Sequence, residues 1–242
     1  MSQEQSQINS QVGQNLQQVR QQILDATDKA NRQANSVTLL AVSKTKPVEA
    51  IMAAIEAGQT QFGENYVQEG VEKVQYFQQQ LLPAPLCWHF IGPIQSNKTK
   101  PIAEHFDWVH SIDRLKIATR LSQQRPENLA PLQVLIQVNT SGEASKSGVM
   151  PHEVAQLCQQ VNQLEQLELR GLMSIPAPTQ DPTQQRQAFE ELAQLFTQLQ
   201  SDYPRFDTLS MGMSGDMQAA IDSGSTMVRI GTAIFGARDY SK

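Results

Sequence analysis

Short apolar runs alternate along most of the chain with longer segments in which apolar residues recur at steps of three and four. The short runs predict strands, because about four to eight residues rich in aliphatic and aromatic side chains suit a buried strand. These runs are Thr38–Ser43, Gln61–Gly63, Trp88–Gly92, Trp108–Ser111, Leu132–Asn139, Leu167–Met173, Thr208–Met211 and Met227–Ile230. The segments between them predict helices, among them Val48–Ala57, Asn65–Gln79, Asp113–Gln124, Glu153–Leu164 and Thr183–Asp202. This alternation predicts βαβ units and a parallel sheet.

The number of strand and helix units favours one fold class, an α/β single (β/α)8 barrel of the TIM type. An open, doubly wound sheet is the alternative, but no Gly-x-Gly-x-x-Gly follows the first predicted strand to support it. The length of 242 residues suits one large domain, and no linker rich in proline, glycine or serine divides the chain. We therefore expect a single domain over residues 1–242.

The glutamine-rich first segment carries a helical pattern of its own. Its apolar residues recur at helical spacing, at Ile8, Val12, Leu16, Val19 and Ile23. This spacing predicts an extra N-terminal helix from about Ile8 to Ala30, whose apolar stripe covers part of the barrel. We expect residues 1–7 to be frayed.

Composition narrows the classes of partner. The formal net charge of −5 argues against nucleic acid, which favours a basic face. No apolar run approaches the roughly 20 residues of a membrane span, and the N-terminus lacks a signal-peptide pattern. Cys87 and Cys158 have no spacing typical of a disulfide or a metal site, which favours a reducing compartment. We expect a cytoplasmic protein with no nucleic-acid or membrane partner.

Two segments near the end of the chain have the composition of phosphate-binding loops. Ser210–Ser214 and Val228–Thr232 are apolar runs that end in glycine and hydroxyl residues. Glycine lets backbone N–H groups approach a phosphate, and a hydroxyl adds one more donor. TIM barrels often bind phosphate at the loops after strands seven and eight, which is where these two segments lie.

Lys44 follows the first predicted strand and is the candidate nucleophile. Partial burial at a strand end favours the neutral amine, the form that attacks a carbonyl. Lys46 is a rival that strand parity does not exclude, although Pro47 places it at the entry to the next helix, a position that more often faces solvent. A lysine beside a phosphate site suggests an aldehyde cofactor held as an imine.

Arg229 lies within the last predicted strand, where a cation is costly to bury without a partner. One explanation is a salt bridge at the bottom of the barrel. The other is a contact with a pyridine nitrogen, which a permanently charged guanidinium would keep unprotonated. Ser214 also has two compatible explanations, a phosphate contact and a cap of the helical stretch that Gly215-Asp216 opens.

Several longer motifs resemble one family. They are Leu39-Leu40-Ala41-Val42-Ser43-Lys44-Thr45-Lys46-Pro47, Phe62-Gly63-Glu64-Asn65-Tyr66, Trp88-His89-Phe90-Ile91-Gly92, Ser145-Lys146-Ser147-Gly148, Gly171-Leu172-Met173 and the two phosphate segments. Their order and content resemble the YggS/PROSC family of pyridoxal phosphate homeostasis proteins from about Val12 to the C-terminus. The fold of that family is similar to the barrel domain of alanine racemase.

The resemblance implies pyridoxal 5'-phosphate as the cofactor and a role for particular residues. It makes Lys44 the imine-forming lysine and Arg229 the partner of the pyridine nitrogen. It assigns the phosphate to Ser214, Gly231 and Thr232. It also implies that three further residues lie near the cofactor: Asn65 and His89 at the barrel mouth, and Met211 packed around the ring together with Met173.

Other candidate residues carry weaker signals. His105, His110 and His152 show no metal-ligand spacing and suit surface or core positions. Lys146 lies in a loop on the expected active face and could attract an anion, but a solvated loop lysine is the more common case. Glu64 has no obvious carboxylate partner for paired acid and base work.

The resemblance implies a carrier or regulator that binds pyridoxal phosphate without substantial catalysis, with apoenzymes that use the cofactor as candidate partners, and we expect a monomer. A pyridoxal phosphate enzyme such as an amino-acid racemase is the alternative, and a phosphosugar enzyme is a third. A racemase needs bases on both faces of the cofactor, and alanine racemases take one from a second domain that we do not expect here. Arg229 would also make the ring a poorer electron sink. No acid and base pair supports the third hypothesis.

Overall fold

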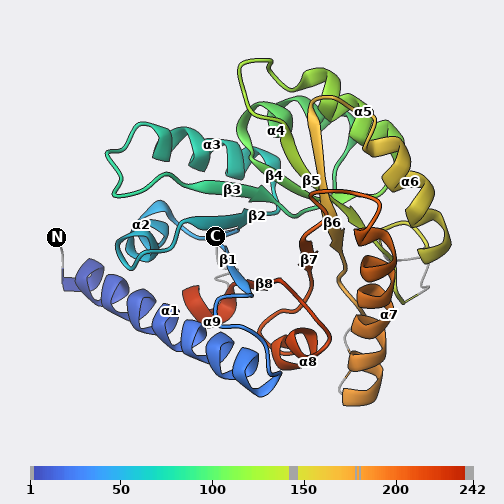
Figure 1. Ribbon diagram of the computed structural model, residues 1–242. Coiled ribbons are helices and arrows are strands. Elements are labelled where there is room, and N and C mark those ends of the chain that lie inside the picture. Colours follow the sequence, from blue (N-terminus) through green and yellow to red (C-terminus); the bar gives the residue numbers. More distant parts are fainter. Residues whose placement is uncertain (1–2, 142–146, 178, 180, 238–242) are drawn as a thin grey trace.

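The chain forms a closed barrel of eight parallel strands in the order of the sequence, β1 to β8, with helices around the outside (Figure 1). The computed structural model describes residues 3–141, 147–177, 179 and 181–237. The strands are β1 Thr38–Val42, β2 Gln61–Glu64, β3 Cys87–Phe90, β4 Trp108–Ile112, β5 Leu132–Gln137, β6 Leu167–Met173, β7 Thr208–Ser210 and β8 Met227–Ile230. The predicted fold class is confirmed, and β6 and β8 have the predicted bounds.

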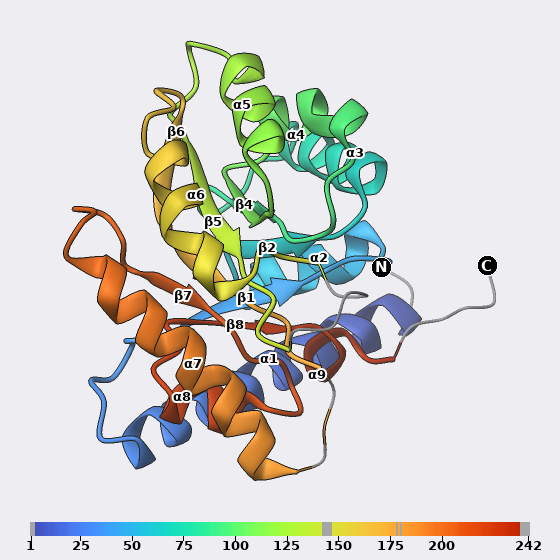
Figure 2. The ribbon, with the colours of Figure 1, turned by 90° about the vertical axis from the view of Figure 1, so that its right-hand side faces the viewer.

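Helices follow the strands and cover the barrel (Figure 2). Those predicted from their pattern are α2 Val48–Glu56, α3 Val67–Gln78, α5 Leu115–Gln124, α6 Val154–Val161 and α7 Pro182–Gln200. The short elements α4 Thr99–His105, α8 Met217–Asp222, α9 Thr232–Phe235 and the 3-10 turns η1 Ser96–Lys98 and η2 Pro151–Glu153 complete the ring. One or two turns of helix give too few periodic positions to predict most of these short elements from sequence.

The N-terminal helix α1 Gln3–Lys29 covers the side of the barrel on which the short helices α8 and α9 lie. It begins five residues before the predicted start, so residues 3–7, which we expected to fray, are helical. Val12, Leu16, Val19 and Ile23 are buried as predicted, whereas the side chain of Ile8 lies outside the described part of the structure. Figure 1 shows α1 running beside α2, α9 and α8. Because α8 and α9 are short, α1 supplies apolar surface that they cannot.

Barrel closure brings the two ends of the chain together. β1 pairs with β8 over four residue pairs, from Thr38 with Met227 to Ala41 with Ile230. This pairing sets the end of β1 beside the end of β8, and β7 lies on the other side of β8. Lys44 and the two predicted phosphate segments therefore meet at the carboxyl ends of the strands, where TIM barrels hold their sites.

The barrel contains two apolar regions. The larger core lies between the strands and the surrounding helices. A smaller cluster inside the barrel consists of Leu40, Ile91 and Met227, with Val42 packed against it. Val42 and Ile91 also face the pocket described below, so this cluster forms part of its floor. In the part of the chain that the structure describes, no helix is long and apolar enough to cross a membrane.

Candidate functional site

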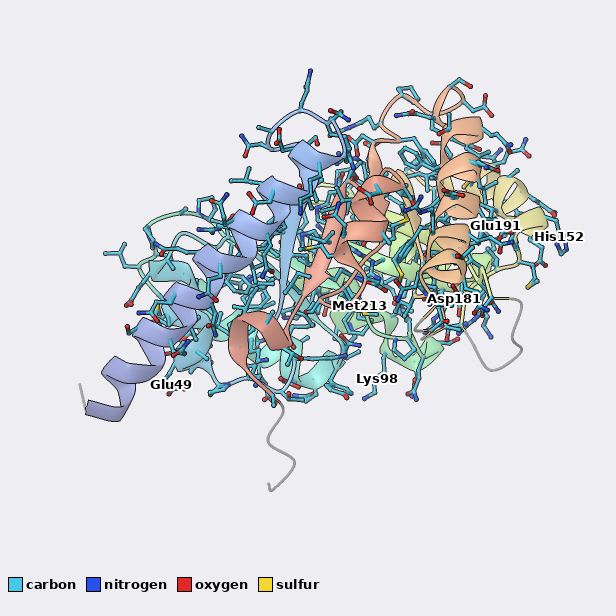
Figure 3. All side chains as sticks on the ribbon, turned by 90° about the horizontal axis from the view of Figure 1, so that it is seen from below. Glu49, Lys98, His152, Asp181, Glu191 and Met213 are labelled. Carbon is cyan, nitrogen blue, oxygen red and sulfur yellow. The ribbon has the colours of Figure 1, made fainter. Side chains whose placement is uncertain are left out.

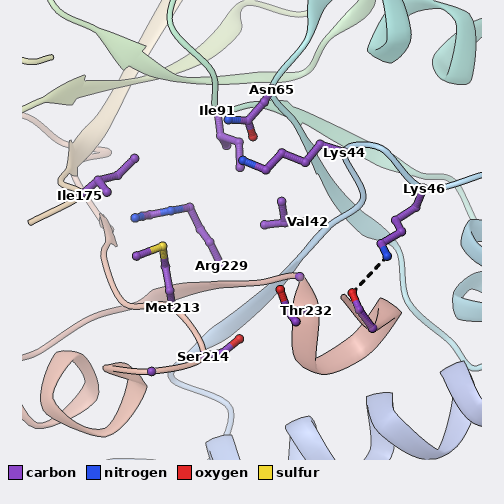
Figure 4. Close-up of a pocket in the computed structure, with 13 residues that line it drawn as sticks. Val42, Lys44, Lys46, Asn65, Ile91, Ile175, Met213, Ser214, Arg229 and Thr232 are labelled. Carbon is purple, nitrogen blue, oxygen red and sulfur yellow. Dashed lines mark hydrogen bonds between the residues drawn. The ribbon is translucent and has the colours of Figure 1, made fainter. Parts of the chain in front are cut away.

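A cavity of about 290 Å³ opens at the carboxyl ends of the first and last strands (Figure 4). Its wall comes from the loops and strand ends of β1, β2, β3, β6, β7 and β8. The lining residues are Val42, Lys44, Lys46, Asn65, Ile91, Ile175, Met213, Ser214, Gly215, Arg229, Gly231, Thr232 and Gly236. The pocket thus combines an apolar floor with amines, a guanidinium and hydroxyl groups.

Six of the eight residues that the sequence singled out line this pocket: Lys44, Asn65, Ser214, Arg229, Gly231 and Thr232. Figure 4 shows Lys44 extending toward Asn65 and Ile91, across the pocket from Ser214 and Thr232. The ends of an elongated ligand with one aldehyde and one phosphate group would meet suitable partners on the two sides.

Lys46, the rival of Lys44, also lines the pocket but is held at its edge. Its Nζ donates to the carbonyl oxygens of Gly236 at 3.0 Å and Ala237 at 2.7 Å. These carbonyls follow α9, so Lys46 ties the loop after β1 to the segment after β8 (Figure 4). The geometry favours Lys44 as the lysine that reaches into the cavity.

His89 and Met211, the other two residues that the sequence singled out, do not line the pocket. Both side chains are fully buried. His89 lies inside the barrel, where its Nδ1 is 2.9 Å from Nε2 of His110, rather than at the mouth. Met211 follows Ser210, which points into the barrel, and successive side chains of an extended segment point to opposite sides. Met211 therefore packs in the outer core, and Met213 lines the pocket in its place.

Met173, the second methionine expected near the ring, is also fully buried and does not line the pocket. Strand periodicity would have shown that Met211 and Ser210 point to opposite sides, if the inward direction of Ser210 had been known. The inward direction of Ser210 could not be predicted from the sequence, because both faces of a barrel strand are buried and apolar.

The backbone around Lys44 is held by a buried polar cluster. Thr45 has a φ of 62°, in the left-handed region that β-branched residues rarely adopt. Its N–H donates to Oε1 of Glu69 at 2.5 Å. On the other side of Lys44, the carbonyl of Ser43 accepts from Nζ of Lys73 at 2.7 Å. Residues of α3 thus fix the turn that presents Lys44.

Lys73 is the centre of this cluster. Its Nζ also lies 2.8 Å from Oε1 of Glu64 and 2.6 Å from Oε1 of Glu69, and the hydroxyl of Ser43 donates to Glu64 at 2.6 Å. The Glu64 side chain is fully buried and its second oxygen has no hydrogen-bond partner. Burial raises the pKa of Glu64, while Lys73 and Ser43 act in the opposite direction.

Lys73 and Glu69 support the site although nothing in their local sequence pointed to it. Their spacing of four residues on a predicted helix was visible and is typical of an ion pair. Nothing local showed that this pair faces β1 and β2 instead of solvent. Glu64, for which we expected no carboxylate partner, shares Lys73 with Glu69.

Arg229 is a buried cation that forms no ion pair with a carboxylate of the described residues. Its Nη1 donates to Oγ of Ser210 at 2.7 Å and its Nη2 to the carbonyl of Ser174 at 2.8 Å. The expected alternative, a salt bridge at the bottom of the barrel, is not found within the described ranges of the chain. Burial lowers the pKa of Arg229 to about 10, an effect that the charge of Asp216 partly offsets. The guanidinium therefore remains charged at neutral pH.

Two glycines allow close backbone contacts at the rim. A Cβ on Gly92 would lie 2.1 Å from the carbonyl oxygen of Asn65, so only glycine fits beside the loop that carries Asn65. A Cβ on Gly231 would lie 3.1 Å from the carbonyl oxygen of Val42, so glycine lets the end of β8 approach β1. Oδ1 of Asn65 is buried and has no hydrogen-bond partner among the residues that the structure describes, which leaves an acceptor at the pocket wall for a ligand.

The remaining candidates lie elsewhere. His105 bonds to the carbonyl of Pro101 on α4 through Nδ1 at 3.0 Å. His152 is exposed at the outer edge of the molecule, far from Met213 (Figure 3). No group of side chains within the described residues could hold a metal ion. Lys146 lies outside the residues that the structure describes.

Comparison with known proteins places the chain in a family. Residues 14–239 match the pattern of the alanine racemase N-terminal domain. The chain is 62% identical to the pyridoxal phosphate homeostasis protein of Vibrio cholerae over 231 residues, 96% of this chain and 98% of the relative. It is 58% identical to the protein of the same name from Escherichia coli K12, with the same coverage. The chain belongs to the pyridoxal phosphate homeostasis protein family.

Solved structures support the membership of this chain in the pyridoxal phosphate homeostasis protein family. PipY of Synechococcus elongatus PCC7942 with pyridoxal phosphate (PLP) bound is 34% identical, with a TM-score of 0.79 over 93% of this chain and all of PipY. A protein of Bifidobacterium adolescentis is 35% identical, with a TM-score of 0.86 over 97% of each chain. Alanine racemase from Corynebacterium glutamicum, at 13% identity and a TM-score of 0.71, shares the fold, and the match covers 62% of that enzyme.

Proposed function

We propose that this member of the family binds pyridoxal 5'-phosphate in the pocket at the barrel mouth and serves intracellular homeostasis of that cofactor. The observation that carries the proposal is the meeting of Lys44, Arg229 and the hydroxyls of Ser214 and Thr232 around one cavity. The names of the relatives and the PipY structure with the cofactor point to the same ligand. The chemistry of the wall fits it, because an aldehyde, an aromatic nitrogen and a phosphate each find a suitable partner.

Each group of the cofactor has a candidate contact. The Lys44 amine would bond the aldehyde carbon, since the cofactor supplies an aldehyde that condenses with a primary amine and releases water. Ser214, Gly231 and Thr232 would hold the phosphate, at the loop position common in TIM barrels. Arg229 would face the ring nitrogen, to which a guanidinium can only donate. The unpartnered Oδ1 of Asn65 would accept from a hydroxyl of the ligand.

The pocket favours holding the cofactor over turning over amino acids. Among the described residues that line it, the ionisable groups are Lys44, Lys46 and Arg229, all cationic types. Proton abstraction from a bound amino acid needs a positioned base and a ring that accepts electrons. Lys46 is held by two carbonyls, and Arg229 does not release its proton at neutral pH. A racemase-like enzyme is the second candidate, because the barrel is shared with alanine racemases.

Other aspects of the function stay predictions. These are a cytoplasmic location, a monomeric state and transfer of the cofactor to apoenzymes that use it. Each follows from the sequence or the family.

Borohydride trapping tests the central assignment. The purified protein is incubated with pyridoxal phosphate, reduced and digested, and the modified peptide is mapped by mass spectrometry. We expect the pyridoxyl group on Lys44, its loss in Lys44→Ala and its retention in Lys46→Ala. Circular dichroism verifies that both variants are folded. A label on Lys46 or Lys146 in the wild-type protein would contradict the assignment.

A further inference from the structure

Inside the barrel, Arg229 is the first member of a chain of polar side chains that continues away from the pocket. Oγ of Ser210 accepts from Nη1 of Arg229 and lies 3.1 Å from Nδ1 of His110. Nε2 of His110 lies 2.9 Å from Nδ1 of His89, and Nε2 of His89 lies 3.3 Å from Sγ of Cys87. The chain therefore connects β8, β7, β4 and β3 across the barrel interior.

The members of this chain from Arg229 to His89 are shielded from water, and Cys87 at its far end is half-buried. Ser210, His110 and His89 are fully buried, and Arg229 is 4% exposed. The ring of His89 stacks on Trp108, with ring centroids 5.3 Å apart. The guanidinium of Arg170 lies over the Trp108 ring, 4.8 Å from its centroid. Burial keeps both imidazoles neutral: it lowers the pKa of His89 to about 3 and, with the charge of Arg229 adding to it, holds the pKa of His110 well below its ordinary value.

The positions of the hydrogens follow from what each group can donate. A guanidinium has no lone pair, so Arg229 must donate to Ser210. The hydroxyl hydrogen of Ser210 then needs an acceptor, and Nδ1 of His110 is its available partner. His110 must therefore carry its hydrogen on Nε2 and donate to Nδ1 of His89. By the same reasoning, His89 carries its hydrogen on Nε2 and donates to Sγ of Cys87.

The opposite direction fails at Ser210. If Nδ1 of His110 donated to Ser210, the serine oxygen would accept two hydrogen bonds, from His110 and from Arg229. Its own hydroxyl hydrogen would then have no acceptor among the described contacts. A buried unsatisfied donor costs about 1–3 kcal/mol. The first arrangement satisfies every donor and acceptor between Arg229 and Cys87, so it fixes one tautomer for each histidine.

We propose that His110, supported by His89, is a positioning residue that fixes the guanidinium of Arg229 at the pocket through the hydroxyl of Ser210. This inference rests on the proposed function for its consequence, the contact of Arg229 with the cofactor ring. The geometry of the chain from Arg229 to Cys87 is independent of the proposed function. In the part of the chain that the structure describes, Arg229 donates to Ser210 and Ser174 and to no carboxylate, so these two acceptors set its direction. Ser210 accepts well only while its own hydrogen points to His110.

The tautomers are tested first, on the protein without added cofactor. Long-range proton–nitrogen NMR of 15N-labelled histidines should show His89 and His110 neutral, each protonated on Nε2. Assignment uses His89→Phe and His110→Phe. A hydrogen on Nδ1 of either ring, or an imidazolium at neutral pH, would overturn the relay. This measurement stands whether or not the protein binds pyridoxal phosphate.

The effect on the cofactor is tested by titration and absorption spectroscopy. In His110→Phe the guanidinium of Arg229 is no longer fixed and should lose its charge-assisted hydrogen bond to the ring nitrogen. Binding of pyridoxal phosphate should therefore weaken about tenfold. The absorption band of the bound cofactor should also shift, because it responds to charge near the ring nitrogen. Ser214→Ala, a phosphate-side variant, should weaken binding without moving the band. His152→Phe, the same substitution at an exposed histidine, should change neither.

The possible outcomes separate the two proposals. No binding by the wild-type protein would contradict the proposed function and leave the relay to be judged by the NMR result. Binding by His110→Phe with an unmoved band would overturn the positioning role. If His110→Phe does not fold, Ser210→Ala removes the same link with a smaller change of volume and must give the same shift.

Discussion

Arg229 shows how one side chain decides the character of a site. It is a strand residue that points into the barrel, forms no ion pair with a carboxylate in the described ranges and stays charged when buried. Its neighbours Ser210 and Ser174 offer only neutral acceptors. A ligand group that accepts a hydrogen bond at this position gains a fixed cation, which suits an unprotonated ring nitrogen.

The phosphate contacts give a prediction for single hydroxyl groups. Ser214→Ala and Thr232→Ala each remove one hydrogen bond to a charged group, worth about 1.5–3 kcal/mol. Affinity for pyridoxal phosphate should fall by about one to two orders of magnitude, as measured by fluorescence or absorbance titration. Binding of pyridoxal, which has no phosphate, should not change.

Thr197→Ala is the matched control, because Thr197 is an exposed threonine on α7. Its loss should leave both affinities at the wild-type value. Equal affinity for pyridoxal phosphate in all three variants would place the phosphate elsewhere.

At the scale of elements, α3 supports the loop that follows β1. The ammonium of Lys73 contacts a backbone carbonyl of that loop and two carboxylates. Because this ammonium is buried, it compensates the charge of Glu64 inside the protein. Removing one partner of a buried ion pair leaves the other uncompensated, which costs more than the pair itself contributes.

Lys73→Met should therefore lower the free energy of unfolding by about 3–5 kcal/mol, as measured by urea denaturation. Lys100→Met is the control, since Lys100 and Glu104 form an ion pair of the same spacing at the surface, 3.7 Å apart. That substitution should cost less than about 0.5 kcal/mol. Glu64→Gln combined with Lys73→Met should restore part of the stability. Equal losses in the two lysine variants would show that the buried pair has no special role.

At the scale of the whole molecule, closing the barrel encloses two neutral histidines. Their pKa values lie below those of the unfolded chain, about 6.5, so as pH falls the unfolded state binds protons before the folded state does. Stability is therefore retained above about pH 6.5 and lost as pH falls toward the folded pKa, about 3 for His89. Glu64, whose pKa is raised, acts in the opposite direction, so variants must be compared.

Each buried histidine should contribute a slope of about 1.4 kcal/mol per pH unit below pH 6. Urea denaturation of the wild-type protein and of His110→Phe between pH 6 and pH 4.5 measures it. The slope for His110→Phe should be smaller by about that amount. His152→Phe should keep the wild-type slope, because His152 is exposed. Identical slopes in all three proteins would mean that His110 is charged in the folded state.

From the composition of the pocket wall we also expect slow proton exchange at the α-carbon of bound amino acids. Incubation with cofactor and L-amino acids in deuterated water should give α-proton exchange well below about 1 s⁻¹, the lower end of ordinary enzyme turnover. The reason is the set of cationic groups at the wall. Proton NMR measures the exchange. A rate of about 1 s⁻¹ or more would favour the racemase-like alternative.

The order and type of the long elements, and with them the fold class, could be predicted from the residue pattern. Hydrophobic periodicity is local, so β6 and β8 were predicted with the observed bounds. The sequence also placed Lys44 and the two hydroxyl segments at strand ends, and parallel strands bring such ends to one edge. Six of the eight candidate residues lie at the pocket for that reason.

The direction in which each strand side chain points, and the distant groups that meet, could be read only from the folded barrel. It placed His89 inside the barrel, exchanged Met211 for Met213 and paired Glu64 with Lys73. Both faces of a strand in a closed parallel barrel are buried, so an apolar run does not show which side chains point inward. Contacts such as His110 with Ser210, 100 residues apart, arise when the barrel closes and depend on its register.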